Sequence, residues 1–236
     1  PAVPFPVLKN LKMGNTAKSE ISYKGKIPLR HRCLSLIKFV TEYFRYRHIR
    51  GKKVWNQNLW RDFIIRKAIL KDVNSIEDTY NEHFQYELNH TAFTVFKKGV
   101  YPTKDDAERA IYAGALFVYE ENGTIVGSII IDKVQPIEYA TIPWKEKLSE
   151  DEVMVIHLLM VRPSMSGKGI ASSLIKFATE LAQKNSCRAL RLDTGSQNIP
   201  ALSLYQKNGF EIIASASKKV GDVIAHKNHL FLEKIL

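Results

Sequence analysis

The pattern of hydrophobic and polar positions is clearest near the middle of the chain. Residues 153–161 are almost wholly apolar and are followed by Pro163, so they predict a strand that is buried on both faces. After a turn that contains Gly167 and Gly169, apolar residues recur at the three- and four-residue steps of a helix with one apolar side. These residues are Ile170, Leu174, Phe177, Ala178 and Leu181. A strand, a glycine turn and a helix in this order direct free backbone N–H groups at one point, which favours a phosphate-bearing ligand.

Shorter patterns predict the elements on either side. Strands are expected at residues 62–67, 115–120, 124–132, 189–193, 211–217 and 224–233, and helices at residues 71–89, 104–112 and 198–208. Thr103 is a suitable N-cap for the second of these helices, and Asn122-Gly123 suits a tight hairpin turn. Residues 133–150 are expected to form a long loop. Strands on both sides of a βαβ centre predict an α+β fold with a mixed sheet.

Three classes of phosphate-bearing ligand use such a glycine turn. A Walker loop requires G-x-x-x-x-G-K-[ST], which the chain lacks. A dinucleotide fingerprint requires G-x-G-x-x-G, but Ser172 stands at the third glycine, although Asp193 follows at a distance that suits a ribose contact. The 43 residues that follow Asp193 are too few for the rest of a doubly wound sheet. The downstream residues favour the third class, coenzyme A.

Two elements of the sequence resemble the GNAT superfamily of N-acetyltransferases, and the resemblance covers about residues 62–236. The first is Leu159-Met160-Val161 followed by Ser166-Gly167-Lys168-Gly169-Ile170-Ala171, which is similar to the family patterns L-x-V and [QR]-x-x-G-x-[GA]. Ser166 replaces the usual Arg or Gln, so one side-chain contact to a phosphate is lost while the backbone donors remain. The second element, Asn198 to Phe210, matches N-x-x-A-x-x-x-Y-x-x-x-G-F completely. The surrounding sequence resembles small bacterial acetyltransferases of unassigned acceptor.

The resemblance implies an acetyl-CoA-dependent N-acetyltransferase, an acyltransferase with an α/β three-layer fold whose central, mostly antiparallel, twisted sheet is flanked by helices. Direct transfer in a ternary complex is expected, because the chain offers no plausible activated nucleophile. Tyr205 occupies the position whose hydroxyl protonates the leaving thiolate in many relatives, and a phenol with a pKa of about 10 can do so. A purely structural role is the alternative for each of three residues. Lys168 is then a solvated surface lysine, Tyr205 a core tyrosine and Asn198 the N-cap of its helix. The residues expected to bind the cofactor are Leu159, Met160, Val161, Ser166, Gly167, Lys168, Gly169, Ile170, Ala171, Asn198 and Tyr205.

The group that accepts the proton of the amine is left open. An alkyl amine has a pKa of about 10.4 and must lose a proton before it attacks. His157 is expected on the same face of the central strand as Leu159 and Val161, and a neutral imidazole can accept a proton near pH 7. A buried histidine that is bonded to a backbone carbonyl is the alternative, and Glu152 and Glu120 are carboxylate candidates for the same role.

The acceptor itself is expected to be an amine on a small molecule or a peptide. Its pocket is predicted from the first two helices and the loop at residues 133–150. Tyr139, Trp144, Tyr101 and Phe84 are candidates for an aromatic wall, or else ordinary core residues.

The positive charge of the chain is concentrated before residue 62. Residues 1–61 hold 14 Lys or Arg but 2 Asp or Glu, whereas residues 62–236 hold 21 and 22. We therefore predict a basic N-terminal extension at residues 1–61, with one helix near residues 33–49, and an enzyme-like domain at residues 62–236. The extension suits nucleic acid or an anionic membrane surface, an organellar targeting segment, or a solvated tail.

Composition narrows the setting and the function classes. Cys33 and Cys187 give neither a disulfide framework nor a metal-ligand spacing, so no metal is expected and a reducing, cytoplasmic setting is favoured. No apolar run approaches the roughly 20 residues that span a bilayer. Besides the N-acetyltransferase, a non-catalytic coenzyme A or nucleotide sensor and a nucleic-acid binder acting through residues 1–61 remain open, as does a homodimer.

Overall fold

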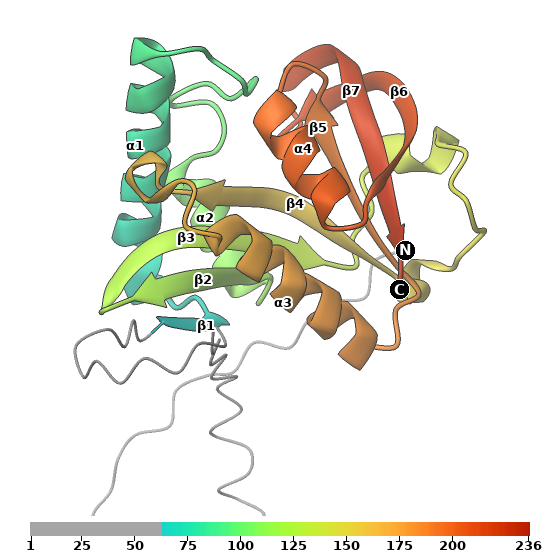
Figure 1. Cartoon of the computed structure of the whole chain (residues 1–236), viewed down its shortest axis with the longest axis horizontal. Helices are drawn as coiled ribbons and strands as arrows, with labels where there is room; N and C mark the ends of the chain where they lie inside the picture. The colour runs from blue at the N-terminus through green and yellow to red at the C-terminus, as the bar shows by residue number, and fades with distance from the viewer. Residues whose placement is uncertain (1–62) are drawn as a thin grey trace, which may run out of the picture. The chain divides into compact units, whose positions relative to one another are not determined.

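The computed structural model describes residues 63–236, which form a seven-stranded sheet with helices on both faces (Figure 1). The strands lie in the order β1-β2-β3-β4-β5-β7-β6. β4 and β5 run parallel, and the other neighbouring pairs are antiparallel. The predicted α+β fold with a mixed, mostly antiparallel sheet is confirmed.

The bounds of the elements follow the sequence pattern closely. The strands are β1 (Phe63–Lys67), β2 (Leu116–Glu121), β3 (Thr124–Asp132), β4 (Val153–Val161), β5 (Ala189–Gly195), β6 (Glu211–Val220) and β7 (Ile224–Ile235). The α-helices are α1 (Val73–Asn89), α2 (Lys104–Tyr112), α3 (Ile170–Lys184) and α4 (Ile199–Lys207). Short 3-10 helices lie at η1 (Leu70–Asp72), η2 (Ile137–Thr141), η3 (Glu150–Glu152) and η4 (Pro163–Met165).

Local chemistry explains where several elements begin and end. The Thr103 hydroxyl accepts a hydrogen bond from the Asp106 backbone N–H at 3.2 Å, so it caps α2 as expected. The two residues between β2 and β3, Asn122 and Gly123, both have positive φ, at 52° and 76°, as a tight two-residue hairpin turn requires.

Several predicted boundaries were wrong. β5, β6 and β7 end two or three residues later than predicted, at Gly195, Val220 and Ile235. The first helix was predicted to begin at residue 71, but α1 begins at Val73 because residues 70–72 form the tighter η1 turn. The loop predicted at residues 133–150 contains η2, whose Tyr139 is buried.

The sheet separates two main apolar clusters. One lies between the sheet and α3 and α4, and includes Met154, Ile156 and the fully buried Leu174. The other lies between the sheet and α1 and α2, and includes Ile76, Leu158 and Met160. In Figure 1, α3 crosses in front of the sheet while α1 stands at the far end of β4. Truncating a side chain such as Leu174 to alanine would cost about 2–5 kcal/mol of stability.

A third cluster extends the core beyond α1. Val153 and Val155 alternate with Met154 and Ile156, so they point to the opposite face of β4 from the α3 cluster. Tyr139, Ile142 and Phe231 cover them. Residues that the sequence places in a loop therefore complete the core at the end of the sheet farthest from α1.

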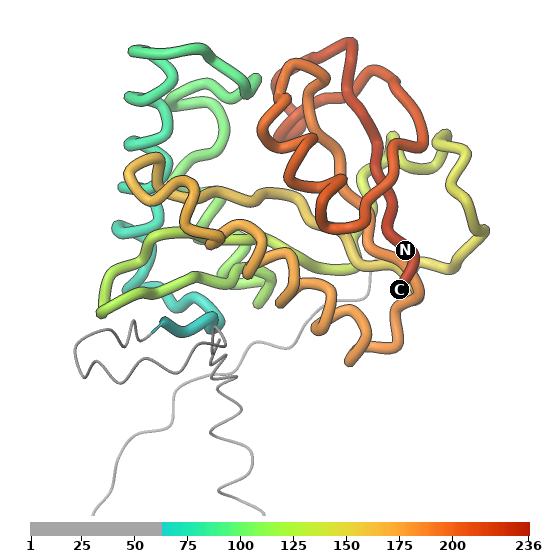
Figure 2. The backbone as a smooth tube through the Cα atoms, in the orientation of Figure 1, coloured from blue at the N-terminus to red at the C-terminus, as the bar shows by residue number. Residues whose placement is uncertain are grey.

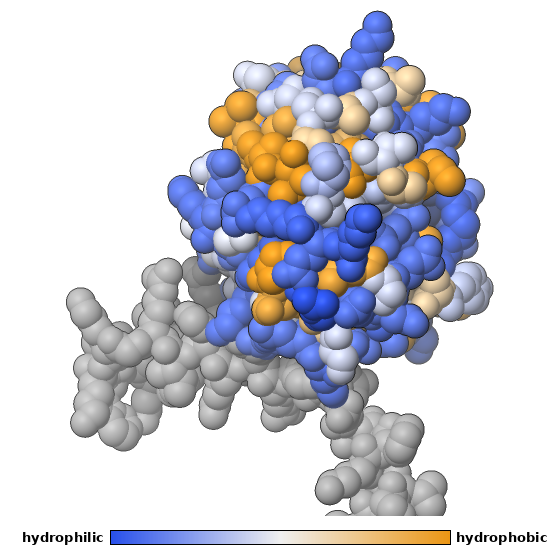
Figure 3. Space-filling view, turned by 90° about the vertical axis from the view of Figure 1, so that its right-hand side faces the viewer, coloured by the Kyte–Doolittle hydropathy of each residue, from blue (hydrophilic) through white to orange (hydrophobic). Residues whose placement is uncertain are grey.

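The surface of the described residues is mixed rather than uniformly apolar. Figure 3 shows hydrophobic areas broken by hydrophilic side chains on the side of the molecule that faces right in Figure 1. Within residues 63–236, no helix is both long and apolar enough to cross a membrane. The predicted basic extension at residues 1–61, with its helix, lies outside the described residues.

Candidate active site

The two parallel strands at the centre of the sheet part from each other halfway along. Their pairing runs from Val153 with Ala189 to Ile156 with Leu192, and it ends there. Beyond that point β4 stays paired with β3, whereas β5 stays paired with β7. Figure 1 shows β4 running toward α1 while β5 turns up beside β7. The divergence opens a cleft in the middle of the sheet.

A β-bulge lies where the strands part. Ile131 pairs with Ile156 and Ile130 pairs with Leu158, so His157 is an extra residue on β4 without a counterpart on β3. The bulge changes the side-chain alternation, because Ile156 and Leu159 pack toward α3 while Leu158 packs toward α1. The bulge therefore interrupts the period-two alternation that was used to place His157 on the face of Leu159 and Val161.

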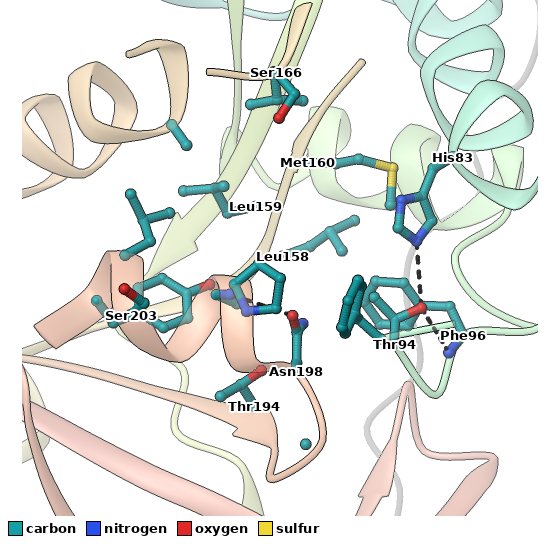
Figure 4. Close-up of a pocket in the computed structure, with 18 of the residues that line it drawn as sticks. His83, Thr94, Phe96, Leu158, Leu159, Met160, Ser166, Thr194, Asn198 and Ser203 are labelled. Atoms are coloured by element: carbon teal, nitrogen blue, oxygen red, sulfur yellow. Dashed lines mark hydrogen bonds between the residues drawn. The ribbon is translucent and has the colours of Figure 1, made fainter. Parts of the chain in front are cut away.

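The cleft continues into a cavity of about 650 Å³. Figure 4 shows β4 residues Leu158, Leu159 and Met160 between its two sides. We call one side the glycine-turn side, made of residues 161–172 and α4. The other is the α1 side, made of His83, Tyr86, Glu87 and residues 93–96. Most of the predicted site residues line this cavity, namely His157, Leu159, Met160, Val161, Ser166, Gly167, Gly169, Ile170, Ala171, Asn198 and Tyr205.

The glycine-turn side is built mainly from backbone groups. Gly167 and Gly169 have φ of 74° and 81°, a left-handed conformation that other residues adopt only with strain. Gly169 is the N-cap of α3 and has no side chain that could accept from the first amides of the helix. Those amides, beginning at Ile170, have no acceptor within the helix and carry the positive end of its dipole. The turn can therefore hold an anionic group such as a phosphate.

A carboxylate on α1 holds the glycine turn in place. Glu82 accepts hydrogen bonds from the Arg162 guanidinium at 2.9 Å and from the Ser164 backbone N–H at 3.0 Å. Figure 2 shows the turn between β4 and α3 lying beside α1. Burial alone would raise the pKa of Glu82, but the hydrogen bonds from Ser164 and Arg162 outweigh it and lower that pKa. Glu82 is thus an ionised anchor for the turn.

The helix α4 presents two of the predicted residues to the cavity. The Asn198 side-chain oxygen accepts from the Ala201 N–H at 3.3 Å, so Asn198 is the N-cap of α4. Tyr205 is 7% exposed, and its ring meets Phe210 edge to face at 5.9 Å. Burial, together with the negative charge of Asp193, raises the pKa of Tyr205 above its ordinary range. Tyr205 is therefore a protonated phenol at neutral pH.

Three charged residues that were predicted for the site, Lys168, Glu152 and Glu120, are not among the described residues that line the cavity. The Lys168 ammonium is exposed and lies 3.0 Å from the Met165 sulfur. Glu152 lies in η3, before the start of β4, whereas the cavity begins at Ile156, and Glu152 bonds Ser149 and Arg188. The prediction of Glu152 as a base is corrected, because its side chain is not among those that line the cavity. Glu120 instead forms an ion pair with Arg66 at 2.7 Å.

His157 reaches a partner that the sequence did not predict. Its Nε2 lies 2.8 Å from Asp132 Oδ1, and the two side chains are 24% and 30% exposed. Burial alone would raise the pKa of Asp132, but the bond and charge of His157 lower it. The pair can hold a proton at the edge of the cavity. Asp132 ends β3, and only the bulge and the register of β3 on β4 bring the two residues together.

The aromatic wall predicted for the acceptor lies elsewhere. Tyr139 and Trp144 pack on Phe231 in the third cluster, and Trp144 stacks with the Arg191 guanidinium at 4.2 Å. Phe84 is a core residue on the buried face of α1, and Tyr101 packs on Gly221 at the tip of the β6–β7 hairpin. The structure corrects this prediction, because Tyr86, Phe93 and Phe96 form the aromatic part of the α1 side instead.

The α1 side is held together by a second carboxylate. Glu87 Oε1 accepts from the backbone N–H groups of Phe93 and Thr94, both at 2.8 Å. Its Oε2 accepts from the Thr94 hydroxyl at 2.7 Å, and Thr94 in turn lies 3.3 Å from His83 Nε2. Sequence reasoning missed these residues. The signal that was available is the i, i+4 spacing of His83 and Glu87, which places them on one face of a helix.

Asp193 lies at the seam between the two diverging strands. It is bonded by Tyr139 at 2.9 Å, by Lys218 at 2.8 Å and by His229 at 3.2 Å. Burial would raise the pKa of Asp193, but the His229 hydrogen bond and the charge of Lys218 bring it below its ordinary range. His229 Nδ1 lies 2.8 Å from His226 Nδ1, so one proton is shared between them. This network fixes the floor of the cavity on the β5 side.

Comparison with known proteins agrees with this geometry. An uncharacterized N-acetyltransferase of Methanocaldococcus jannaschii is 26% identical over 222 residues, which is 89% of each chain. A GNAT-family acetyltransferase structure from Streptococcus agalactiae covers 76% of this chain and 99% of its own, with a TM-score of 0.62 at 18% identity. A Salmonella typhimurium structure assigned as an acetyltransferase, with its cofactor acetyl-CoA, covers 74% and 94%, with a TM-score of 0.54 at 20% identity. At these identities the two structures show the fold.

The match to a family model covers the site itself. The model of the acetyltransferase (GNAT) family matches residues 73–210, which begin at α1 and end just after α4. This range includes both sides of the cavity. The chain therefore belongs to the GNAT family of acetyltransferases.

Proposed function

We propose that this protein is an acetyl-CoA-dependent N-acetyltransferase that transfers the acetyl group directly to an amine in a ternary complex. The observation that carries the proposal is the convergence of the glycine turn, the N-terminus of α3 and Tyr205 on one cavity, at the point where β4 and β5 part. Family membership supports acetyl transfer, and the structural neighbour described with acetyl-CoA supports this donor.

The cofactor is proposed to bind along the glycine-turn side. Backbone amides of residues 167–171 suit the diphosphate, and Lys168 adds a positive charge near the mouth without lining the cavity. The unpaired edge of β4 at Leu159–Val161 suits the pantetheine arm, which carries amides of its own. A backbone N–H there would also stabilise the oxyanion, an effect worth about 2.7–4 kcal/mol for one donor in other enzymes. Asn198, whose side chain caps α4, is proposed to contact the cofactor from that side.

Tyr205 is proposed to protonate the leaving thiolate. Its raised pKa keeps the phenol protonated at neutral pH, so the proton is present when the C–S bond breaks. His157 is proposed to accept the proton that the attacking nitrogen releases, with Asp132 stabilising the resulting imidazolium. Direct transfer is favoured because Cys187, the cysteine within the described part of the chain, is buried beside Asp151 and has a raised pKa.

The acceptor is proposed to be an amine that enters beside the α1 side. Tyr86, Phe93 and Phe96 offer apolar and aromatic contacts there, and the carboxylate of Glu87 is already bonded by the chain itself. These features favour an amine on an apolar body. The cytoplasmic setting, the basic extension and its binding to nucleic acid, and the homodimer stay predictions.

The proposal is tested by thermal unfolding with acetyl-CoA. A ligand at 100 times its Kd stabilises the fold by about 2.7 kcal/mol, so Tm should rise by several degrees. Unchanged Tm at millimolar acetyl-CoA would overturn the proposal. Thiol release with small amines, amino acids and peptides then separates the enzyme from a coenzyme A sensor, which binds the cofactor but releases no thiol. Retention on heparin that depends on residues 1–61 would support a nucleic-acid binder.

A further inference from the structure

We propose that His83 is the catalytic base that removes a proton from the incoming ammonium group, held in the required tautomer by Thr94 and Glu87. This inference rests on the proposed function, because it assigns a step of acetyl transfer at the same cavity. It concerns the α1 side, whereas His157 lies on β4 at the bulge.

The hydrogen bonds decide which nitrogen of His83 carries the proton. A carboxylate only accepts, so the Thr94 hydroxyl must donate its single hydrogen to Glu87 Oε2, at 2.7 Å. Thr94 Oγ1 is then an acceptor toward His83 Nε2, at 3.3 Å, which places the hydrogen of the neutral imidazole on Nε2. The other nitrogen, Nδ1, keeps a free lone pair. In Figure 4 the His83 ring bonds Thr94 with one nitrogen and turns the other toward Met160.

The surroundings suit a base near neutral pH. Burial between Phe84 and Phe96, whose ring centroids each lie 6.1 Å from the imidazole, disfavours the charged form. Burial lowers the pKa of His83 more than the charge and bond of Glu87 raise it, so the ring is neutral at pH 7. Once Nδ1 takes a proton, Glu87 Oε2, 3.4 Å from Nε2, stabilises the imidazolium.

Other titratable groups also face the cavity. They are His157 from β4, Asp193 from β5, Tyr205 and Lys207 from α4, and His229 from β7. Glu87 is the charged group that acts on the pKa of His83. The part of the acid limb of the pH profile that His83→Gln removes is therefore assigned to His83 with Glu87.

The ammonium group loses two protons during the reaction, and two histidines accept them. His83 takes one proton from R–NH3⁺ and later releases it to solvent. The neutral amine attacks, the C–N bond forms, and His157 takes the second proton from nitrogen. The C–S bond breaks, Tyr205 protonates the thiolate, and the proton on His157 restores the phenol. The sum is R–NH3⁺ plus acetyl-CoA giving the amide, free coenzyme A and one H⁺.

The test compares His83→Gln with Asn81→Gln in full-length protein, using acetyl-CoA and phenethylamine. Asn81 is the control, because it is exposed on the same helix and does not line the cavity. His83→Gln should lower kcat/KM at pH 7 by about 10²-fold, the lower end for general base catalysis. This deficit should shrink as the pH rises toward the pKa of the amine, about 10.4, because the amine then arrives neutral. A deficit independent of pH, or no deficit, overturns the proposal.

Two further variants test the relay. Thr94→Ser keeps the hydroxyl and should keep the activity, whereas Thr94→Val should lower kcat/KM several-fold. Equal activity of the two variants overturns the relay through Thr94.

Nuclear magnetic resonance of ¹⁵N-labelled histidines tests the tautomer without turnover. At pH 7.5 the wild-type His83 should be neutral with its hydrogen on Nε2, and a charged ring or an Nδ1–H tautomer overturns the proposal. The proposed function fails separately, if acetyl-CoA does not shift the Tm of the wild-type protein and no amine is acetylated. In that case the resonance measurement still shows which tautomer His83 adopts.

Discussion

The two sides of the cavity are built by different means. The glycine-turn side comes mainly from one continuous stretch of chain, and main-chain amides at residues 167–171 are proposed as its binding surface. The α1 side joins residues 83–87 to residues 93–96, and side chains make both its surface and its internal bonds. The diphosphate of the cofactor is the same in every reaction of the family, so backbone groups, which do not depend on side-chain identity, suffice to bind it. The amine acceptor differs between relatives, so its recognition requires side chains that differ as well.

The difference has a consequence for mutations. A surface of backbone groups tolerates changes of side chain but not of backbone conformation, so glycine is its sensitive residue. A surface of side chains responds to single polar substitutions, because each one breaks a hydrogen bond. Variants of the two sides should therefore separate cofactor affinity from acceptor turnover.

The largest effect on stability is expected from a substitution of Asp193, at the seam between β4 and β5. Asp193→Asn leaves Lys218 buried without its charged partner, which costs about 3–5 kcal/mol of stability. The folded-state pKa of Asp193 is lowered, so its stabilisation is present above the unfolded pKa, about 3.9, and is lost as the pH falls through the folded value. Urea unfolding at pH 7 and pH 3 measures the gap between wild type and variant. A gap of equal size at both values contradicts the role of the ionised carboxylate.

Gly169→Val should weaken acetyl-CoA binding by about 10²- to 10³-fold. The variant strains a φ of 81°, at about 1–3 kcal/mol, and moves the first amides of α3. Gly123→Val is the matched control, since Gly123 also has positive φ and open space around its Cα but lies in the β2–β3 turn. Isothermal titration calorimetry should find lost affinity only at position 169. Similar losses in both variants would mean that strain, not the turn, is responsible.

Tyr205→Phe should lower kcat by about 10²-fold while the Kd for acetyl-CoA stays within twofold. The ring keeps its packing on Phe210, so Tm should change little. Stopped-flow measurement of thiol release, paired with calorimetry, checks both quantities. Unchanged kcat removes Tyr205 from the chemistry.

The smallest effect is expected at the contact between the two sides. Glu82→Gln removes the charge that bonds Arg162 and Ser164, so the glycine turn is held less firmly. Affinity for acetyl-CoA should fall roughly fivefold, or about 1 kcal/mol. Asp78→Asn, an exposed acid on the same helix, is the control. Equal affinity of Glu82→Gln and wild type would show that the turn holds itself.

The two sides of the cavity also differ in how well the sequence predicted them, because one is local in sequence and the other is not. Ser166, Gly167, Gly169, Ile170, Ala171, Asn198 and Tyr205 all line the cavity. The sequence pointed to them because strand, turn and helix follow one another along the chain, so local spacing reports their geometry. Thr103 as a cap and Asn122-Gly123 as a turn were found for the same reason. The predictions that did not hold were long-range. Glu152 and Trp144 are candidates by residue type alone, and neither reaches the cavity.

The sequence alone determined the elements, their order along the chain, the family and the glycine turn, since each depends on interactions between residues close in sequence. Tertiary structure decided the rest. The register of β3 on β4 makes the bulge at His157 and brings Asp132 to it. The fold of residues 93–96 back onto α1 joins Thr94 to Glu87 and His83. Such contacts depend on how distant segments pack, and no local pattern in a single chain encodes that packing.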